Sequence, residues 1–238
     1  MLILALDTSS ASGSLALLRD ATVLTPLAIS PNQPYSASLL REATKLLEDA
    51  RISFEEIDLF AVDAGPGSFT GLRVGLTTVK GWAEVWEKRI AAVSGLEAIA
   101  AQICRSVAPG SFIAAVTDAR RGQIFGALFR RRDDGSGLLD RLGNDVVASA
   151  DEFLQSLRPQ VGGTDTLAVA CLQVEVVRPA MQRLGFSCSR IEVVSDVLAP
   201  FVGQLGYVKA VRGDVIDALH LDANYIRRSD AEMNWKSS

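Results

Sequence analysis

Short apolar runs alternate with amphipathic segments along most of the chain. The apolar run from Ile57 to Val62 leads into a glycine-rich turn, and a segment with helical spacing of its apolar residues, 71–88, follows the turn. Apolar runs of about four to eight residues bounded by turn residues are typical of buried strands, whereas a three-to-four-residue spacing is typical of helices. The alternation therefore predicts an α/β protein.

Two stretches of the chain repeat one pattern. Residues 2–18 and residues 113–129 each read as an apolar strand that ends in an aspartate, a short turn containing glycine, and a second apolar strand. Asp7 and Asp118 occupy the same place in the two stretches. Turn chemistry of this kind predicts two β-hairpins, and a repeat of this size predicts two halves built on one plan.

Each predicted hairpin is followed by further helices and strands. In the first half we expect these elements: strand Thr22–Ile29, helix Ser36–Ala50, strand Ile57–Val62, helix 71–88, strand Ile90–Val93 and helix Leu96–Val107. In the second half we expect these: a helix that opens with the capping box of Ser149 and Glu152 and ends at Arg158, strand Thr166–Cys171, helix Gln173–Leu184, strand Ile191–Val194 and helix Val197–Val211.

Composition narrows the class of protein. The chain has 238 residues, 48% of them hydrophobic, and a net charge of −4, so we expect a large core and no overall basic surface for nucleic acid. Cys104, Cys171 and Cys188 are scattered, which favours reduced thiols and a cytoplasmic protein. The apolar start, Leu2 to Leu6, ends in Asp7, so we expect neither a signal peptide nor a membrane segment.

The turn itself, residues 64–75, reads A-G-P-G-S-F-T-G-L-R-V-G. Gly65 and Gly67 permit close approach of another group to the backbone, and Ser68 and Thr70 can cap the helix that follows. A glycine turn that opens a helix predicts an anion cradle. The alternative is a tight strand-to-helix turn that holds no ligand.

Helix 71–88 presents a stripe of mostly small residues beside its apolar core stripe. The small-residue stripe consists of Gly71, Gly75, Thr78 and Trp82. Glycine inside a helix costs about 1 kcal/mol relative to alanine, so Gly75 and Gly81 need a packing reason. We interpret the stripe as an interface with another subunit. The alternative is close packing inside the same domain.

Three motifs carry a resemblance to a known family. They are L-D-T-S near the start, the turn A-G-P-G-S-F-T-G-L-R-V-G, and Y-I-R-R-S-D-A-E near the end. In this order they resemble the TsaB (YeaZ) family. The resemblance implies two actin-like lobes of the sugar-kinase and heat-shock chaperone ATPase superfamily, with duplicated β-hairpin-containing mixed sheets flanked by helices. We expect residues 1–103 plus 218–238 to form the first lobe and residues 104–217 the second.

The resemblance also implies a function. It implies a non-catalytic scaffold or activating subunit of the machinery that makes threonylcarbamoyladenosine beside the anticodon of tRNA. Its partners would be TsaD, which carries the metal and the chemistry, and the ATPase TsaE. It would form a homodimer when alone, pairing through the helices of the first lobe, and meet tRNA only through the complex.

Two enzymatic alternatives remain. The first is an ATP-dependent enzyme of the sugar-kinase type. With either function, the candidate weak phosphate site consists of Asp7, Gly65, Gly67, Ser68 and Thr70, although Asp7 can equally be a turn residue that closes its hairpin. Ala170 and Cys171 stand where the family often has the glycines that admit adenosine, which argues against tight nucleotide binding.

A metallopeptidase is disfavoured because His220, which we expect on a helix, is the only histidine, so we expect no metal site and no catalytic residue.

Overall fold

The computed structural model describes residues 1–10, 12–29, 35–161, 167–186 and 190–227. They form two compact units. The first contains Met1–Gly95 and Asp196–Tyr225. The second contains Leu96–Ser195 and, among the described residues, Ile226 and Arg227.

The first unit is built on a five-stranded sheet with the order β3-β2-β1-β4-β5. Its strands are β1 (Leu2–Asp7), β2 (Ser14–Arg19), β3 (Thr22–Ala28), β4 (Leu59–Asp63) and β5 (Arg89–Val93). β1, β2 and β3 form an antiparallel meander, whereas β4 and β5 run parallel to β1. The carboxyl ends of β1, β4 and β5 therefore lie at one edge of the sheet.

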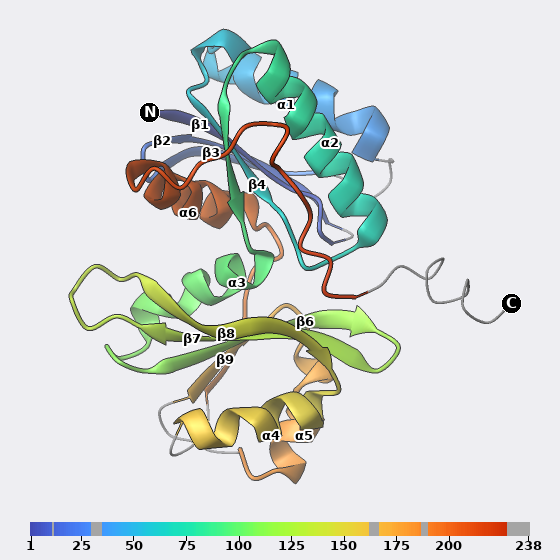
Figure 1. Cartoon of the computed structure of the whole chain (residues 1–238), viewed down its shortest axis with the longest axis vertical. Helices are drawn as coiled ribbons and strands as arrows, with labels where there is room; N and C mark the ends of the chain where they lie inside the picture. The colour runs from blue at the N-terminus through green and yellow to red at the C-terminus, as the bar shows by residue number, and fades with distance from the viewer. Residues whose placement is uncertain (11, 30–34, 162–166, 187–189, 228–238) are drawn as a thin grey trace, which may run out of the picture. The chain divides into compact units, whose positions relative to one another are not determined.

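Helices cover both faces of this sheet (Figure 1). They are α1 (Tyr35–Ala50), α2 (Phe69–Val85) and α6 (Ala199–Val211). Leu4 and Leu6 of β1 share a core with α1 and α2. Ala5 points to the opposite face, where Gly203 lets α6 approach the strands closely. This alternation along β1 is the two-residue side-chain period of a strand buried on both sides.

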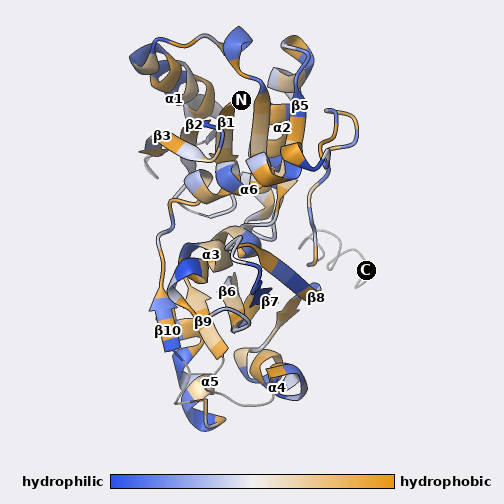
Figure 2. Cartoon of the chain, turned by 90° about the vertical axis from the view of Figure 1, so that its left-hand side faces the viewer, coloured by the Kyte–Doolittle hydropathy of each residue, from blue (hydrophilic) through white to orange (hydrophobic). Residues whose placement is uncertain are grey.

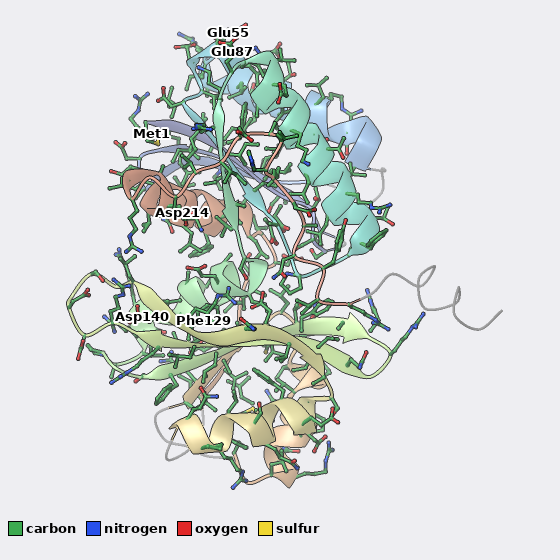
Figure 3. All side chains as sticks on the ribbon, viewed as in Figure 1. Met1, Glu55, Glu87, Phe129, Asp140 and Asp214 are labelled. Carbon is green, nitrogen blue, oxygen red and sulfur yellow. The ribbon has the colours of Figure 1, made fainter. Side chains whose placement is uncertain are left out.

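The second unit repeats the same sheet in the order β10-β9-β6-β7-β8. Its strands are β6 (Phe112–Arg120), β7 (Gln123–Arg131), β8 (Leu139–Ala148), β9 (Leu167–Cys171) and β10 (Arg190–Val193). Its helices are α3 (Gly95–Ile103), α4 (Ala150–Val161) and α5 (Arg178–Arg183). Figure 1 shows α3 on one face of this sheet and α4 with α5 on the other. Phe129 of β7, labelled in Figure 3, is fully buried within this unit.

The two units thus confirm the predicted duplication and the α/β class. In each, an antiparallel meander of three strands is extended by two parallel strands. Figure 2 shows β8 and β10 in mixed hydrophilic and hydrophobic colours, in keeping with their positions at the two edges of the second sheet. Among the described residues, no helix has both the length and the apolar character needed to cross a membrane.

Two differences from the expected elements have a clear cause in the sequence. β8 was not predicted, because its sequence contains no continuous apolar run and Gly143, with φ +82°, interrupts the alternation. The helix predicted over Gln173–Leu184 is a 3-10 turn, Val174–Val176, followed by the short α5. Pro179 lies in the first turn of α5, where its missing N–H is tolerated, and it favours a new helix start there.

The boundaries between the two compact units also differ from the expected ones. The first unit ends at Gly95 and resumes at Asp196, whereas we expected boundaries after residues 103 and 217. α6, which we expected in the second lobe, packs on β1, β2, β4 and β5 of the first. The reason is its pattern of small residues. Gly206 lies against Ala61 of β4 and Gly203 against Leu18 of β2, so the helix backbone reaches that sheet.

Candidate functional site

The glycine turn joins β4 to α2 in the first unit, as predicted. Gly65 has φ +108°, a conformation that favours glycine. The hydroxyl of Ser68 accepts a hydrogen bond from the N–H of Gly71 at 3.3 Å and caps α2. Thr70 lies inside the first turn of α2 and is exposed, so the capping role belongs to Ser68 alone.

Several N–H groups of the turn are satisfied from within the chain. The N–H of Gly65 donates to Oδ1 of Asp63 at 2.7 Å, and the N–H of Ser68 donates to the carbonyl of Ser9 at 2.7 Å. An anion cradle needs N–H groups that point at a ligand. Here these donors hold the turn to its own unit, which favours the alternative of a tight turn that holds no ligand.

The glycines of this region let α2 touch the turn between β1 and β2. A Cβ on Gly67 would lie 2.5 Å from the carbonyl oxygen of Ser9. A Cβ on Gly71 would lie 2.0 Å from the carbonyl oxygen of Thr8. A Cβ on Gly75 would lie 2.2 Å from the Oγ1 of Thr8. The Thr8 hydroxyl in turn donates to the carbonyl of Gly71 at 2.8 Å. Thr8 was not singled out from the sequence, and it is the partner that these glycines accommodate.

The predicted partner interface on Gly71, Gly75, Thr78 and Trp82 needs correction. Both glycines are buried against Thr8 within their own unit. Trp82 is 6% exposed, and its ring packs on that of Phe54, with centroids 5.4 Å apart. Only Thr78 is partly exposed, and its hydroxyl donates to a carbonyl of its own helix. Packing inside the domain, the alternative from the sequence, accounts for the stripe.

Asp7 and Asp118 close their hairpins in the same way. Oδ1 of Asp7 accepts the N–H of Ser9 at 2.8 Å, and Oδ1 of Asp118 accepts the N–H of Arg120 at 2.7 Å. Both bonds reach the residue two positions ahead, as in an Asx-turn. The hairpin role considered for both aspartates is confirmed.

Asp63 is a site residue that the sequence analysis missed. It ends β4 as Asp7 ends β1, and the pairing of Leu6 with Val62 makes the two aspartates neighbours. Asp7 is 0% and Asp63 1% exposed. Burial raises the pKa of Asp63 well above its ordinary value, and the charge of Asp7 raises it further. Two apolar strands that each end in aspartate were the available signal.

Burial also raises the pKa of Asp7, and its surroundings extend to α1. The hydroxyl of Tyr35, the first residue of α1, donates to the carbonyl of Ser10 at 2.8 Å. Burial raises the pKa of Tyr35 to about 12, with the negative charge of Asp7 as the next cause. Tyr35 is therefore a neutral hydrogen-bond donor that ties α1 to the first hairpin.

In the second unit, the residues expected to face adenosine are inside a strand. Ala170 and Cys171 are both fully buried in β9, and Cys171 belongs to the core shared with α4 and α5. Burial raises the pKa of the Cys171 thiol to about 11. Nucleotide binding, tight or weak, stays a prediction.

The single histidine lies in a turn beyond the end of α6 at Val211, and not in a helix as expected. His220 is exposed, and its Nδ1 lies 2.6 Å from Oδ1 of Asp217. The described part of the chain contains no group of three or more His, Cys, Asp or Glu side chains that could hold a metal ion.

Two units with matching sheet orders, one of which carries the glycine turn and its buried aspartates, define a protein of the actin-like ATPase fold. A solved structure with this arrangement is the ROK hexokinase from Thermus thermophilus, with a TM-score of 0.51 at 10% identity over 89% of this chain and 100% of that one. The chain belongs to the TsaB (YeaZ) family.

Similarity to a curated TsaB protein carries this assignment, while the matched family model is that of TsaD and a solved YeaZ structure shows the fold. Residues 30–217 match the family model of TsaD, described as tRNA N6-adenosine threonylcarbamoyltransferase. The tRNA threonylcarbamoyladenosine biosynthesis protein TsaB of Bacillus subtilis is 30% identical over 100% of this chain and 99% of its own length. The structure of YeaZ from Pseudomonas aeruginosa superposes with a TM-score of 0.76 at 23% identity, over 94% of this chain and 99% of that one.

Proposed function

We propose that this protein is the non-catalytic subunit of a system that forms threonylcarbamoyladenosine in tRNA, and that it acts by pairing with the transferase TsaD, with TsaE as the third component. The full-length similarity to a TsaB protein supports this role. The observation that carries the non-catalytic part is that two donors of the glycine turn, the N–H groups of Gly65 and Ser68, are engaged by Asp63 and Ser9.

Charge supports the same conclusion. Asp7 and Asp63 lie at the strand ends where the glycine turn begins, and no positive charge is among the main influences on either carboxyl. A phosphate at this turn would meet negative charge in a buried setting, where electrostatic repulsion is stronger than in water. The turn is thus better suited to hold α2 against the first hairpin than to hold a nucleotide.

The outward face of α2 offers a contact for the partner. Gly81 lies inside α2, is exposed, and would meet no atom within 4 Å if it carried a Cβ. Since glycine at such a position costs about 1 kcal/mol and gains nothing within the chain, a packing reason outside the chain is favoured. Val85, one turn further along α2, is 71% exposed. We propose Gly81, in place of Gly75, as the point of close approach to TsaD.

Reconstitution tests the function. The purified chain is mixed with TsaD, TsaE, tRNA and the substrates of the modification, and threonylcarbamoyladenosine is measured by mass spectrometry. We expect modification only when this chain is present, and no turnover of Mg-ATP by the chain alone. Steady ATP hydrolysis by the isolated chain, together with an unaltered tRNA yield when it is omitted, would support the sugar-kinase alternative.

A matched pair of variants tests the contact. Gly81→Leu should weaken binding to TsaD at least about tenfold, which corresponds to about 1.4 kcal/mol, because the larger side chain keeps a partner helix away. Gly81→Ala adds one methyl group at the same position and serves as the control for altered helix propensity. Equal binding by wild type and Gly81→Leu in a calorimetric titration would remove α2 from the interface without affecting the proposed function.

A further inference from the structure

Two buried oxygen atoms lack a hydrogen-bond partner at one edge of the first sheet. They are Oδ2 of Asp7 and Oδ2 of Asp63, within the part of the chain that the structure describes. Both side chains are at least nine-tenths buried. Unpaired acceptors in such a setting are costly, because they lose their bonds to water and gain none in return.

The backbone fixes how the two carboxyls face each other. β1 and β4 are adjacent and parallel, with Leu6 paired to Val62, so the two aspartates follow at the same level. Each Oδ1 is occupied by an N–H of its own turn, from Ser9 at 2.8 Å and from Gly65 at 2.7 Å. After burial, the negative charge of Asp7 is the largest influence that raises the pKa of Asp63, as expected of two carboxyls at the ends of adjacent strands.

Gly95 makes room for the Asp63 carboxyl. A Cβ on Gly95 would lie 2.4 Å from Oδ2 of Asp63, so this position must be glycine if the carboxyl is to sit there. The carboxyl is therefore accommodated by the backbone at the start of α3, next to the carboxyl end of β5.

Among the described residues, the main influences on the two carboxyls include no positive charge. Asp196, which precedes α6, adds negative charge at Asp7. Tyr35 on α1 is neutral in the ordinary pH range, since its pKa is raised to about 12. From the first hairpin, the Ser9 hydroxyl can stabilise negative charge on either carboxyl. A hydroxyl can donate a hydrogen bond to a carboxylate but does not remove its charge, so only a bound proton relieves the repulsion between the two carboxyls.

We propose that Asp7 and Asp63 share one proton at neutral pH and form a carboxylic acid–carboxylate pair. The O–H of one side chain donates to an oxygen of the other, so that Oδ2 of Asp7 and Oδ2 of Asp63 each gain a hydrogen-bond partner. The pair joins the ends of β1 and β4, and through Ser9 and Gly65 it fixes the two turns against which α2 packs. Loss of the proton places two negative charges in contact at this junction.

The sign of the pH dependence follows from the raised pKa of Asp63. A carboxyl whose pKa is higher in the folded than in the unfolded chain binds its proton more tightly when folded. Its contribution to stability is complete below the ordinary value of 3.8 and is lost as pH rises toward the folded pKa. Over that interval the unfolding equilibrium constant rises about tenfold per pH unit for one proton.

The experiment compares Asp63→Asn with wild type and with Asp118→Asn. The amide that Asp63→Asn introduces can donate to Asp7 as the protonated acid does, but it cannot lose a proton in this range. Asp118→Asn makes the same change in the corresponding turn of the second unit, where the side chain is 27% exposed and pairs with Arg120 at 3.4 Å. Urea unfolding of all three full-length proteins is followed from about pH 5 to about pH 9.

We expect the ratio of the unfolding constants of wild type and Asp63→Asn to rise by up to about tenfold per pH unit, while Asp118→Asn follows wild type. The carbon-13 spectrum of aspartate-labelled wild type should contain one buried protonated carboxyl at neutral pH that Asp63→Asn lacks. If Asp63→Asn does not fold, this spectrum of wild type decides the question. Two ionised carboxyls at neutral pH, or parallel pH profiles, would overturn the proposal.

A bound cation is the competing outcome. Magnesium and calcium chloride are added separately to wild type and to Asp63→Asn at neutral pH. A shared proton predicts equal, small effects of salt on the two proteins. Saturable stabilisation of wild type alone would mean that the two carboxylates hold a metal ion in place of the proton, and the proposal would be wrong.

Discussion

The two units share one sheet order but differ where their central parallel strands end. In the first, β4 ends in Asp63, and a glycine turn leads into the 17-residue α2. In the second, β9 ends in Cys171, and a 3-10 turn leads into the six-residue α5. The duplicated frame thus sets the topology, while a few small residues decide whether a long helix can approach the neighbouring hairpin.

The hairpin turns show the same contrast. Asp7 and Asp118 each accept an N–H from the residue two positions ahead. Asp118 remains partly exposed beside Arg120, whereas Asp7 is buried beside Asp63. The same turn-closing aspartate is therefore present in both units, but among the described residues it lies beside a second buried aspartate in the first unit and beside an arginine in the second. The raised pKa of Asp7 thus comes from its buried surroundings and not from the hairpin motif, which Asp118 shares.

The largest expected effect tests whether each unit has its own core. Phe60 of β4 and Phe129 of β7 are both fully buried, one in each unit. Phe60→Ala and Phe129→Ala should each cost about 3–5 kcal/mol of stability, through lost burial and the cavity left behind. Hydrogen exchange should report faster amide exchange mainly in the unit that carries the change. Equal loss of protection in both units for either variant would show that they unfold as one.

A smaller effect separates the two kinds of glycine in α2. Gly71→Ala should cost up to about 3 kcal/mol, because the added methyl meets the carbonyl oxygen of Thr8 and the helix must move. Gly81→Ala should stabilise the isolated chain by about 1 kcal/mol, because the position is open and alanine favours the helix. Urea midpoints of the two variants measure the contrast. A stabilised Gly71→Ala would show that α2 can shift away from the first hairpin without cost.

Much of this frame was predictable from local sequence. The two hairpins, the helix after the glycine turn and the capping box at Ser149 all follow from residues close together in the chain. Hydrophobic periods and turn residues act over such short distances. The cap at Ser68 was found for the same reason.

Contacts between distant segments were not predictable in this way. The helical spacing of α2 shows that Gly71 and Gly75 share one stripe of the helix surface. That this stripe packs on Thr8 follows only from the three-dimensional fold. Asp63 looked like the end of an ordinary strand until the pairing of β1 with β4 placed it beside Asp7. α6 lies more than a hundred residues from the strands it covers, so its assignment to the first unit required the structure.

The smallest expected effect compares the two helix starts. Ser149 caps α4 through a capping box, in which its N–H donates to Glu152 at 2.9 Å and its Oγ accepts the N–H of Glu152 at 3.2 Å. Ser68 caps α2 through one longer bond of 3.3 Å. Ser149→Ala should therefore cost about 1 kcal/mol and Ser68→Ala about 0.5 kcal/mol, with Ser→Thr at each position as the control that keeps the cap.

The two caps should also differ in their pH dependence. Hydrogen bonds from Ser149 lower the pKa of Glu152, so the contribution of the capping box is present above the ordinary pKa of that carboxyl and is lost as pH falls. The bond at Ser68 involves no titrating group and should not change. Thermal unfolding of the four variants at neutral and mildly acidic pH measures both differences. If Ser68→Ala is the more damaging, the cap of α2 supports more than its own helix, and the packing of that helix on the first hairpin depends on how it begins.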